Sequence, residues 1–356
     1  LPGGDRGKQY QGRYVFQGNQ VKDEENDWAL FNELGSAPAT MDGSRSVDLY
    51  GLLPGHAEEQ SDAVQAYTQA FMGDSVPTGP NSDGKVKCET WVRLPKEYWP
   101  KNFHGIRDPV CPLELALYGH PDSGGLWERH CVENLTRAGF KEVENWSSLY
   151  YNEELKLLLM VYVDDFKLSG PKENLAKGWA RIRKGLTLEE PTPVGKCLGC
   201  DHKIRDTTLN GKKVRVMEYD MRAFMAQCVK AYKDKCGKPN MVLRPCDTPF
   251  LPTDKPVNYY AKGGDAESDI MPEDKDQSKG TLAKEASSIL MKILYGARMA
   301  RWDLLKVVSM LAQRVSKWSA SCDKALHRLM CYIETTKDLV LTGHVGDEMK
   351  DLTLKL

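Results

Sequence analysis

The stretch that most constrains the fold of this chain runs from Leu157 to Gly170 and reads LLLMVYVDDFKLSG. Its unbroken apolar half is typical of a buried strand, and alternation of apolar and polar residues resumes at Phe166. A strand, a tight acidic turn and a returning strand form the simplest local structure that fits this pattern. Burial of Asp164 and Asp165 at the rim of a sheet is costly unless positive charge neutralises them. Divalent cations such as magnesium prefer carboxylate oxygens, so the pair is a candidate metal site.

The acidic pair also has an ordinary structural explanation, because Asp tolerates turn geometry and hydrogen-bonds its own backbone. A third carboxylate, Asp62, precedes apolar residues that recur at helical spacing as far as Phe71. This spacing predicts a short helix directly after Asp62. Asp62 is then either the N-cap of that helix or a third metal ligand that the fold brings to the hairpin.

The composition limits the classes of partner without selecting one. The 356 residues contain 49 Lys and Arg against 50 Asp and Glu, a net charge of −1. No global basic field therefore indicates nucleic acid, although a local basic groove can coexist with an acidic metal centre. Ten scattered cysteines favour a reduced intracellular compartment. The longest apolar run is too short to cross a bilayer, so no membrane partner is expected. The first residue is Leu1, and we expect a fragment of a longer protein.

Two further segments carry specific expectations. Cys197, Cys200 and His202 have the look of a partial zinc site, but a structural zinc site needs four ligands, and a strand with small buried cysteines is favoured. Beyond residue 285 the pattern predicts three helices that form a packing module. Asp303 is the expected cap of the second helix, and the third is expected to begin near Asp323.

Taken in order, these pieces resemble the reverse transcriptase of copia-type long-terminal-repeat retrotransposons. The similar motifs are Arg13-Tyr14-Val15-Phe16-Gln17-Gly18, Asp62-Ala63-Val64-Gln65-Ala66-Tyr67, Leu117-Tyr118-Gly119 with Trp127, Tyr162-Val163-Asp164-Asp165, Leu198-Gly199, Thr248-Pro249, Leu294-Tyr295, Arg301-Trp302-Asp303 and the end at Tyr332 to Asp338. Each motif alone is weak, whereas their shared order and spacing are specific. The resemblance covers nearly the whole chain.

The resemblance implies an α+β fold of the right-hand polymerase type, with fingers, a ferredoxin-like palm built on an antiparallel sheet, and a helical thumb or connection. The implied division is fingers and palm at 1–205, a thumb-like segment at 206–252, a linker at 253–284, a helical connection module at 285–342, and the start of a truncated C-terminal region at 343–356.

The resemblance also implies an RNA-directed DNA polymerase. In that family three palm carboxylates hold two Mg²⁺ ions, with Mn²⁺ as a substitute, and these correspond to Asp62, Asp164 and Asp165. Tyr67 corresponds to the aromatic residue that selects deoxyribose, and Arg13 to a contact with the nucleotide triphosphate. The implied partners are an RNA template, a DNA primer, dNTPs and the RNA–DNA hybrid. The implied location is a cytoplasmic particle or the nucleus.

Departures from the family pattern keep alternatives open. Ser61 stands where the family has an apolar residue, Asp122-Ser123-Gly124-Gly125 replaces a Gln-Ala-Pro-Arg turn, and Trp302 replaces a proline. The main alternative is a catalytically decayed retrotransposon remnant that at most binds nucleic acid, and a second is another palm enzyme such as an RNA-directed RNA polymerase. The sequence does not decide the oligomeric state, or whether a ribonuclease H or an integrase belongs to the full protein.

Overall fold

The structure is a computed structural model that describes residues 14–22, 38–72, 90–251 and 278–346. Within these ranges the protein mixes helices with antiparallel sheets, which agrees with the predicted α+β class. The chain divides into two compact units, Leu1–Pro193 and Val194–Leu356. The boundary expected at residue 205 falls inside a strand of the second unit, and the assignment of fingers, palm and thumb stays a prediction.

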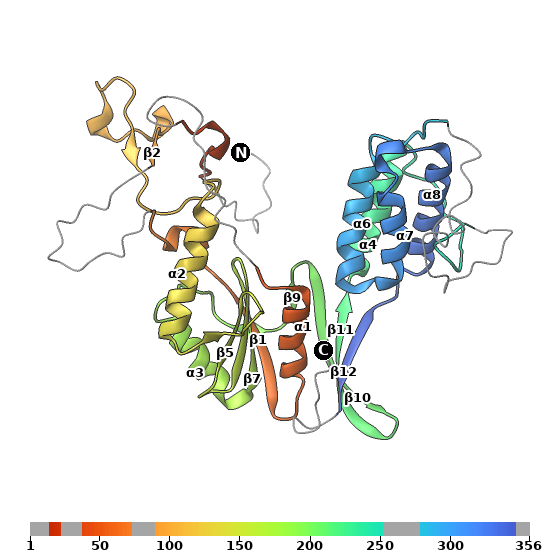
Figure 1. The fold of residues 1–356 in the computed structure, drawn as a ribbon, viewed down its shortest axis with the longest axis horizontal. Helices are drawn as coiled ribbons and strands as arrows, with labels where there is room; N and C mark the ends of the chain where they lie inside the picture. Colours follow the sequence, from red (N-terminus) through yellow and green to blue (C-terminus); the bar gives the residue numbers. More distant parts are fainter. Residues whose placement is uncertain (1–13, 23–37, 73–89, 252–277, 347–356) are drawn as a thin grey trace, which may run out of the picture. The chain divides into compact units, whose positions relative to one another are not determined.

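The first unit is built on a six-stranded antiparallel sheet with the strand order β4-β5-β6-β7-β1-β8 (Figure 1). Its strands are β1 (His56–Asp62), β4 (Lys141–Glu142), β5 (Leu149–Asn152), β6 (Leu157–Tyr162), β7 (Asp165–Pro171) and β8 (Thr192–Pro193). A small separate sheet pairs β2 (Trp91–Val92) with β3 (Cys111–Pro112). The predicted hairpin is confirmed, because β6 and β7 pair antiparallel with Tyr162 opposite Asp165.

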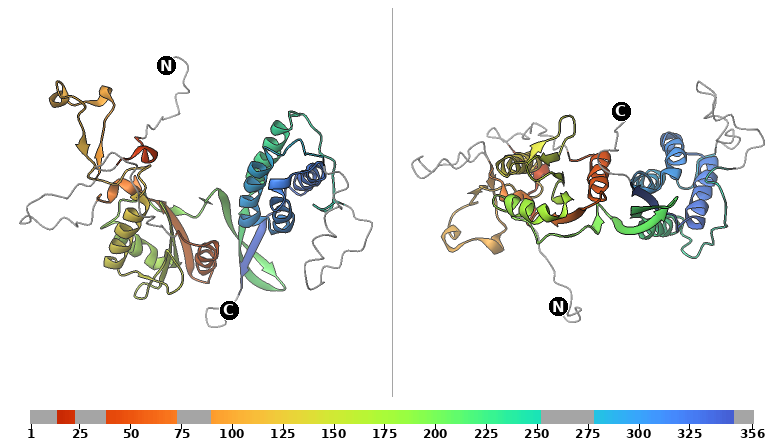
Figure 2. Two further views of the ribbon diagram at one scale, coloured as in Figure 1. Left: turned by 45° about the horizontal axis from the view of Figure 1, so that its top comes forward. Right: turned by 90° about the horizontal axis from the view of Figure 1, so that it is seen from below.

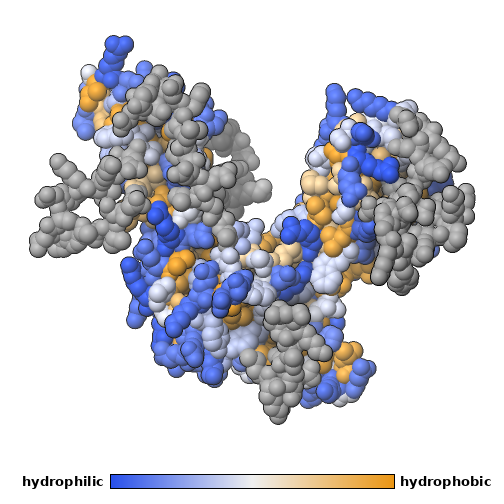
Figure 3. All heavy atoms as spheres, viewed as in Figure 1, coloured by the Kyte–Doolittle hydropathy of each residue, from blue (hydrophilic) through white to orange (hydrophobic). Residues whose placement is uncertain are grey.

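Helices cover both faces of the six-stranded sheet. Phe166 and Leu168 of β7 pack into a core shared with α2 (Ser123–Arg137) and α3 (Lys172–Ile182). Lys167 lies between them in the strand, so its side chain points to the other face, where it meets α1 (Met41–Gly51). Figure 2 shows α1 across the sheet from α2. The face of this unit that is visible in Figure 3 is largely hydrophilic. The apolar core and the buried charges therefore lie on opposite faces of one strand.

A short helix does follow Asp62, as predicted, but its predicted start directly after Asp62 is wrong. Asp62 is the last residue of β1, and the helix is the 3-10 helix η2 (Ala66–Gln69). The β1 sequence, His-Ala-Glu-Glu-Gln-Ser-Asp, carries almost no apolar alternation, so periodicity does not detect this strand. It is a strand because its backbone pairs with β7 along its whole length. The interpretation of Asp62 as a helix N-cap is therefore also wrong.

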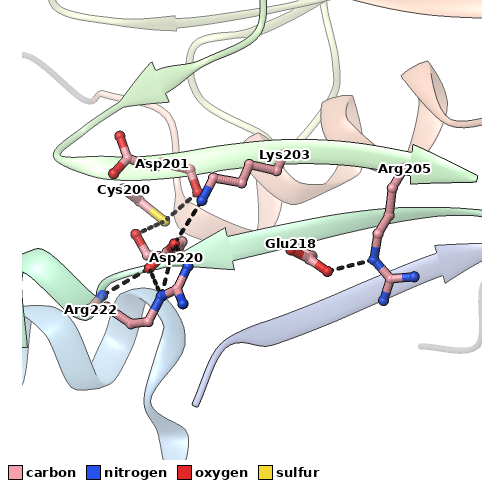
Figure 4. A network of polar contacts seen from close by, with 7 residues as sticks. All are labelled: Cys200, Asp201, Lys203, Arg205, Glu218, Asp220 and Arg222. Atoms are coloured by element: carbon pink, nitrogen blue, oxygen red, sulfur yellow. Dashed lines mark hydrogen bonds and ion pairs between the residues drawn. The ribbon is translucent and has the colours of Figure 1, made fainter. Parts of the chain in front are cut away.

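The second unit combines a four-stranded antiparallel sheet, in the order β12-β11-β10-β9, with a group of helices. The strands are β9 (Lys196–Cys197), β10 (Cys200–Leu209), β11 (Lys212–Asp220) and β12 (Leu341–Val345). The helices are α4 (Arg222–Lys235), α6 (Ala286–Ala300), α7 (Leu305–Ala312) and α8 (Ala320–Thr335). Charged side chains pair across β10 and β11, as Figure 4 shows for Lys203 with Asp220 and Arg205 with Glu218.

The three helices predicted beyond residue 285 are present as α6, α7 and α8, and they share one apolar core with α4. The predicted cap at Asp303 is wrong, because the N-cap of α7 is Leu304. The Asp303 carboxylate instead accepts hydrogen bonds of 2.9 and 2.7 Å from the buried Arg301 guanidinium, whose charge needs a partner in the interior. The third helix was expected to begin near Asp323. It begins at Ala320 instead, and the Ser319 hydroxyl is its N-cap.

Most of the expected linker at 253–284 lies outside the described residues. Among the helices that the structure does describe, none is long and apolar enough to span a bilayer.

Candidate active site

The ends of three neighbouring strands bring the predicted acidic residues together. Asp62, the last residue of β1, lies directly opposite Asp165, the first residue of β7. Asp164 occupies the turn between β6 and β7, and its backbone carbonyl accepts a hydrogen bond of 2.7 Å from the Ala63 amide. A hairpin turn and the end of the adjacent antiparallel strand thus gather three carboxylates at one end of the sheet.

The environment of these acids disfavours their negative charges. Desolvation raises the pKa of Asp165 to about 6, and the charges of Asp164 and Asp62 add to the shift. Desolvation also raises the pKa of Asp62, with contributions from the charges of Glu189 and Asp164, whereas a side-chain hydrogen bond with Asp165 lowers it. Negative charge is therefore crowded at this end of the sheet.

A fourth carboxylate, Glu189, was not expected from the sequence. Its amide donates a 2.9 Å hydrogen bond to the Asp62 carbonyl, and its carbonyl accepts one of 2.8 Å from the Ser61 hydroxyl. The charge of Glu189 is one of the groups that raise the pKa of Asp62. In the sequence this residue belongs to a polar Glu-Glu-Pro segment with no motif around it, so only the tertiary fold places it beside the site.

Of the two predicted nucleotide contacts, Tyr67 lies among the described residues and Arg13 does not. Tyr67 lies in η2, is partly buried, and has its ring centroid 4.6 Å from the ring of Tyr118. Burial raises the pKa of the Tyr67 hydroxyl, and the charge of Asp164 contributes to the shift. Tyr67 therefore lies within electrostatic reach of the acidic turn. Arg13 lies outside the described residues, and its role stays a prediction.

The segment Asp122-Ser123-Gly124-Gly125, which departs from the family pattern, forms the start of α2. The Ser123 hydroxyl accepts a 3.1 Å hydrogen bond from the Leu117 amide and donates one of 2.7 Å to the Leu117 carbonyl. Gly124 and Tyr67 line the same small cavity. The altered segment thus packs next to the predicted sugar-selecting ring, and two hydrogen bonds to Leu117 hold it in place.

The chemistry of the donor set suits a hard divalent cation. Carboxylate oxygens are the ligands that Mg²⁺ prefers, and positive charge would reverse the rise in the pKa values of Asp62 and Asp165. Among the residues with a described structure, no group of three or more His, Cys, Asp or Glu side chains is already arranged to hold a metal ion. Metal binding would therefore require Asp62 and Asp165 to exchange their mutual hydrogen bond for metal ligation.

The residues of the partial zinc motif, Cys197, Cys200 and His202, lie in the second unit. Cys197 and Cys200 are buried in β9 and β10, as the favoured interpretation expects. The His202 ring nitrogen Nδ1 lies 3.1 Å from the Cys200 carbonyl oxygen. Across the described ranges these side chains form no metal-holding group, and they contribute to the interior of the sheet.

Comparison with known proteins connects the chain with yeast transposons. No family model matches it. The Transposon Ty1-DR6 Gag-Pol polyprotein of Saccharomyces cerevisiae is 24% identical over 267 residues, which cover 74% of this chain and 14% of the polyprotein. The Transposon TyH3 Gag-Pol polyprotein of Saccharomyces cerevisiae is 24% identical over 261 residues, which cover 73% of this chain and 14% of that polyprotein.

The chain spans about 14% of the length of these curated relatives. The likeness supports an origin in the polyprotein of a copia-type retrotransposon.

Proposed function

We propose that this chain is the reverse transcriptase region of a copia-type retrotransposon polyprotein, an RNA-directed DNA polymerase that extends a DNA primer on an RNA template. The observation that carries the proposal is the register of β1 against β7, which sets Asp62 opposite Asp165 and next to the Asp164 turn. The similarity to Gag-Pol polyproteins supports the same conclusion. The proposed right-hand architecture assigns the six-stranded sheet to the palm and the second unit to the thumb and connection.

In this proposal Asp62 and Asp164 would hold the two metal ions, and Asp165 would be a weaker participant. Two bound Mg²⁺ ions would supply an activated primer 3′-hydroxyl and charge stabilisation for the departing pyrophosphate. The chain itself aligns the reactants: the hairpin fixes two carboxylates, and β1 fixes the third. Tyr67, partly buried beside Tyr118, would exclude a ribose 2′-hydroxyl by the bulk of its ring.

Primer extension on an RNA template with Mg²⁺ tests this function. Asp164→Ala should reduce DNA synthesis by about 10³-fold or more, because positioning and charge neutralisation supply most of the catalysis of phosphoryl transfer. The matched control is Asp206→Ala, which removes an exposed carboxylate from another hairpin and should change synthesis by less than about twofold. The same assay with ribonucleotides should give almost no product, as expected if Tyr67 selects the sugar.

The outcomes separate the proposal from its main rival. Equal synthesis by the wild-type and Asp164→Ala proteins would reject the enzyme. A wild-type chain that binds RNA–DNA hybrid but extends no primer, with either Mg²⁺ or Mn²⁺, would be the catalytically decayed remnant. Efficient incorporation of ribonucleotides would favour an RNA-directed RNA polymerase.

A further inference from the structure

The turn that carries the acidic pair has an unusual backbone. Val163, the first of its two central residues, has a φ of +58°. A positive φ is uncommon for any residue other than glycine, and for a β-branched residue it is an outlier that the surrounding structure must enforce. Such outliers concentrate at functional sites. Contacts with the surrounding structure must therefore keep this turn in the left-handed conformation.

One of these contacts comes from a buried tryptophan of α2. The indole nitrogen Nε1 of Trp127 donates a hydrogen bond of 2.6 Å to the Val163 carbonyl oxygen. Only 3% of Trp127 is exposed, and its ring packs into the core that α2 and α3 form on one face of the sheet. The next carbonyl along the chain, that of Asp164, is held by the Ala63 amide. Two consecutive peptide groups of the turn are thus held, one from α2 and one from the end of β1.

We propose that Trp127 is a positioning residue for the catalytic acids. Its indole N–H holds the Val163 carbonyl in the orientation that the positive φ requires, and so directs Asp164 and Asp165 toward Asp62. Without this donor the carbonyl loses its partner, and the Val163 peptide can relax to an ordinary φ. Because Asp164 is the next residue, this relaxation would redirect the carboxylates. The catalytic consequence of the inference rests on the proposed polymerase function, whereas the effect on the turn does not.

The surroundings of Trp127 connect it with a second predicted functional residue. Trp127, Val163 and Tyr67 line a common cavity of about 30 Å³. A cavity of this size has room for about one water molecule. The predicted sugar-selecting ring, Tyr67, and the acidic turn therefore both lie beside the cavity that Trp127 lines. A substitution that removes the indole N–H but keeps an aromatic ring at this position should affect the turn more than it affects Tyr67.

The chain provides a matched control in Trp179. This residue of α3 is also 3% exposed and belongs to the same core, but its indole N–H donates to the Glu59 carboxylate at 2.8 Å. Trp127→Phe and Trp179→Phe therefore each remove one indole donor and part of one buried ring. Only the first removes the donor that contacts the turn. Both variants should lower the melting temperature by similar small amounts.

The kinetic test compares the two variants in primer extension. Trp127→Phe should lower kcat by roughly 10- to 100-fold, because a displacement of about 1 Å at reacting groups has effects of this size. KM for the nucleotide should change by less than about threefold. Trp179→Phe should keep kcat within about twofold of the wild-type value. Equal losses of kcat in the two variants, or no loss in Trp127→Phe, would overturn the inference.

A measurement without metal or substrate separates this inference from the proposed function. Amide hydrogen exchange at residues 160–166 should be at least about tenfold faster in Trp127→Phe and unchanged in Trp179→Phe. This result would support the positioning role even if the wild-type chain extended no primer. Unchanged exchange in Trp127→Phe would overturn the role even if the wild-type chain were a polymerase.

The wild-type protein alone gives a third test if Trp127→Phe does not fold. The indole N–H of Trp127 should exchange with solvent at least about tenfold more slowly than that of Trp91, whose side chain is 58% exposed. Equal exchange rates for the two indoles would overturn the hydrogen bond on which the inference rests.

Discussion

Two β-hairpins of this chain have two-residue turns of different chemistry. In hairpin β10–β11 the turn is Asn210-Gly211, and both residues have a positive φ, +51° and +80°. Asn-Gly is the sequence that such turns favour, because Asn tolerates the left-handed region and Gly has no Cβ. In hairpin β6–β7 the turn is Val163-Asp164, and the β-branched Val163 has a φ of +58°. Local sequence preference accounts for the first turn and opposes the second.

The difference shows which turn depends on its surroundings. The Asn210-Gly211 turn needs no outside support, since its residues adopt the required conformation with little strain. The Val163-Asp164 turn is held by a side chain from α2 and a backbone amide from β1. Strain that persists because the surrounding structure over-determines it is common at functional sites. The contrast therefore supports a functional role for the β6–β7 turn and a structural one for the β10–β11 turn.

The largest expected difference between the hairpins concerns one lysine in each. Lys167 of β7 is fully buried, forms an ion pair with Asp48, and lies 3.3 Å from the Glu58 carboxylate. Lys203 of β10 is 55% exposed and pairs with Asp220 at 3.0 Å. Lys167→Met should lower the free energy of unfolding by about 3–5 kcal/mol, because it leaves a buried carboxylate unpaired.

Lys203→Met is the matched change and should cost less than about 1 kcal/mol, as expected of a solvent-screened pair. Urea unfolding of both variants, monitored separately for the two units, measures the difference. Similar costs for the two substitutions would show that the buried network on the α1 face contributes no more than a surface pair.

The next effect concerns one carboxylate in each hairpin, and the two effects have opposite signs. Asp165 has a folded-state pKa of about 6, above the value of about 3.9 for an unfolded chain, so its contribution to stability is full below about pH 4 and is lost as the pH rises through 6. At pH 7 and without metal, Asp165→Asn should therefore raise the free energy of unfolding, by about 1 kcal/mol after allowance for solvent screening.

Asp220 behaves in the reverse way. Hydrogen bonds from the Arg222 side chain lower its pKa, so it stabilises the fold above its unfolded pKa and loses this contribution on acidification. Asp220→Asn should cost about 1–2 kcal/mol at pH 7. Thermal unfolding between pH 2 and 8 distinguishes the two, because the contribution of Asp165 changes between about pH 4 and 6 and that of Asp220 only below about pH 4. Mg²⁺ should abolish the gain from Asp165→Asn if the acids bind metal, and a gain that persists in Mg²⁺ would argue against that ligand.

The smallest effect comes from exchanging the residues at the first turn position. Asn210→Val should cost about 1 kcal/mol, because it puts a β-branched residue at a φ of +51° where Asn fits well. Val163→Asn should stabilise the chain by up to about 1 kcal/mol for the converse reason. Melting temperatures of the two variants measure both signs. A loss of stability in Val163→Asn would show that the Val163 side chain contributes more by packing than its backbone costs.

Much of the first unit could be predicted because its signals are local. The apolar run at 157–163 and the alternation after it define β6 and β7. These features depend on neighbours within one or two turns of the chain. The local sequence therefore predicts the acidic hairpin as a candidate site without reference to any tertiary contact.

The sequence alone determined that two acids lie in a turn after a buried strand and that a third acid precedes them by about a hundred residues. Only the tertiary structure decided that β1 is a strand, that Asp62 lies opposite Asp165, and that Glu189 lies beside them. It also decided that Trp127 reaches the Val163 carbonyl and that Lys167 is buried among charges. The reason is physical: pairing of a polar strand depends on backbone hydrogen bonds with a distant partner, and these carry no signature in the strand's own side chains.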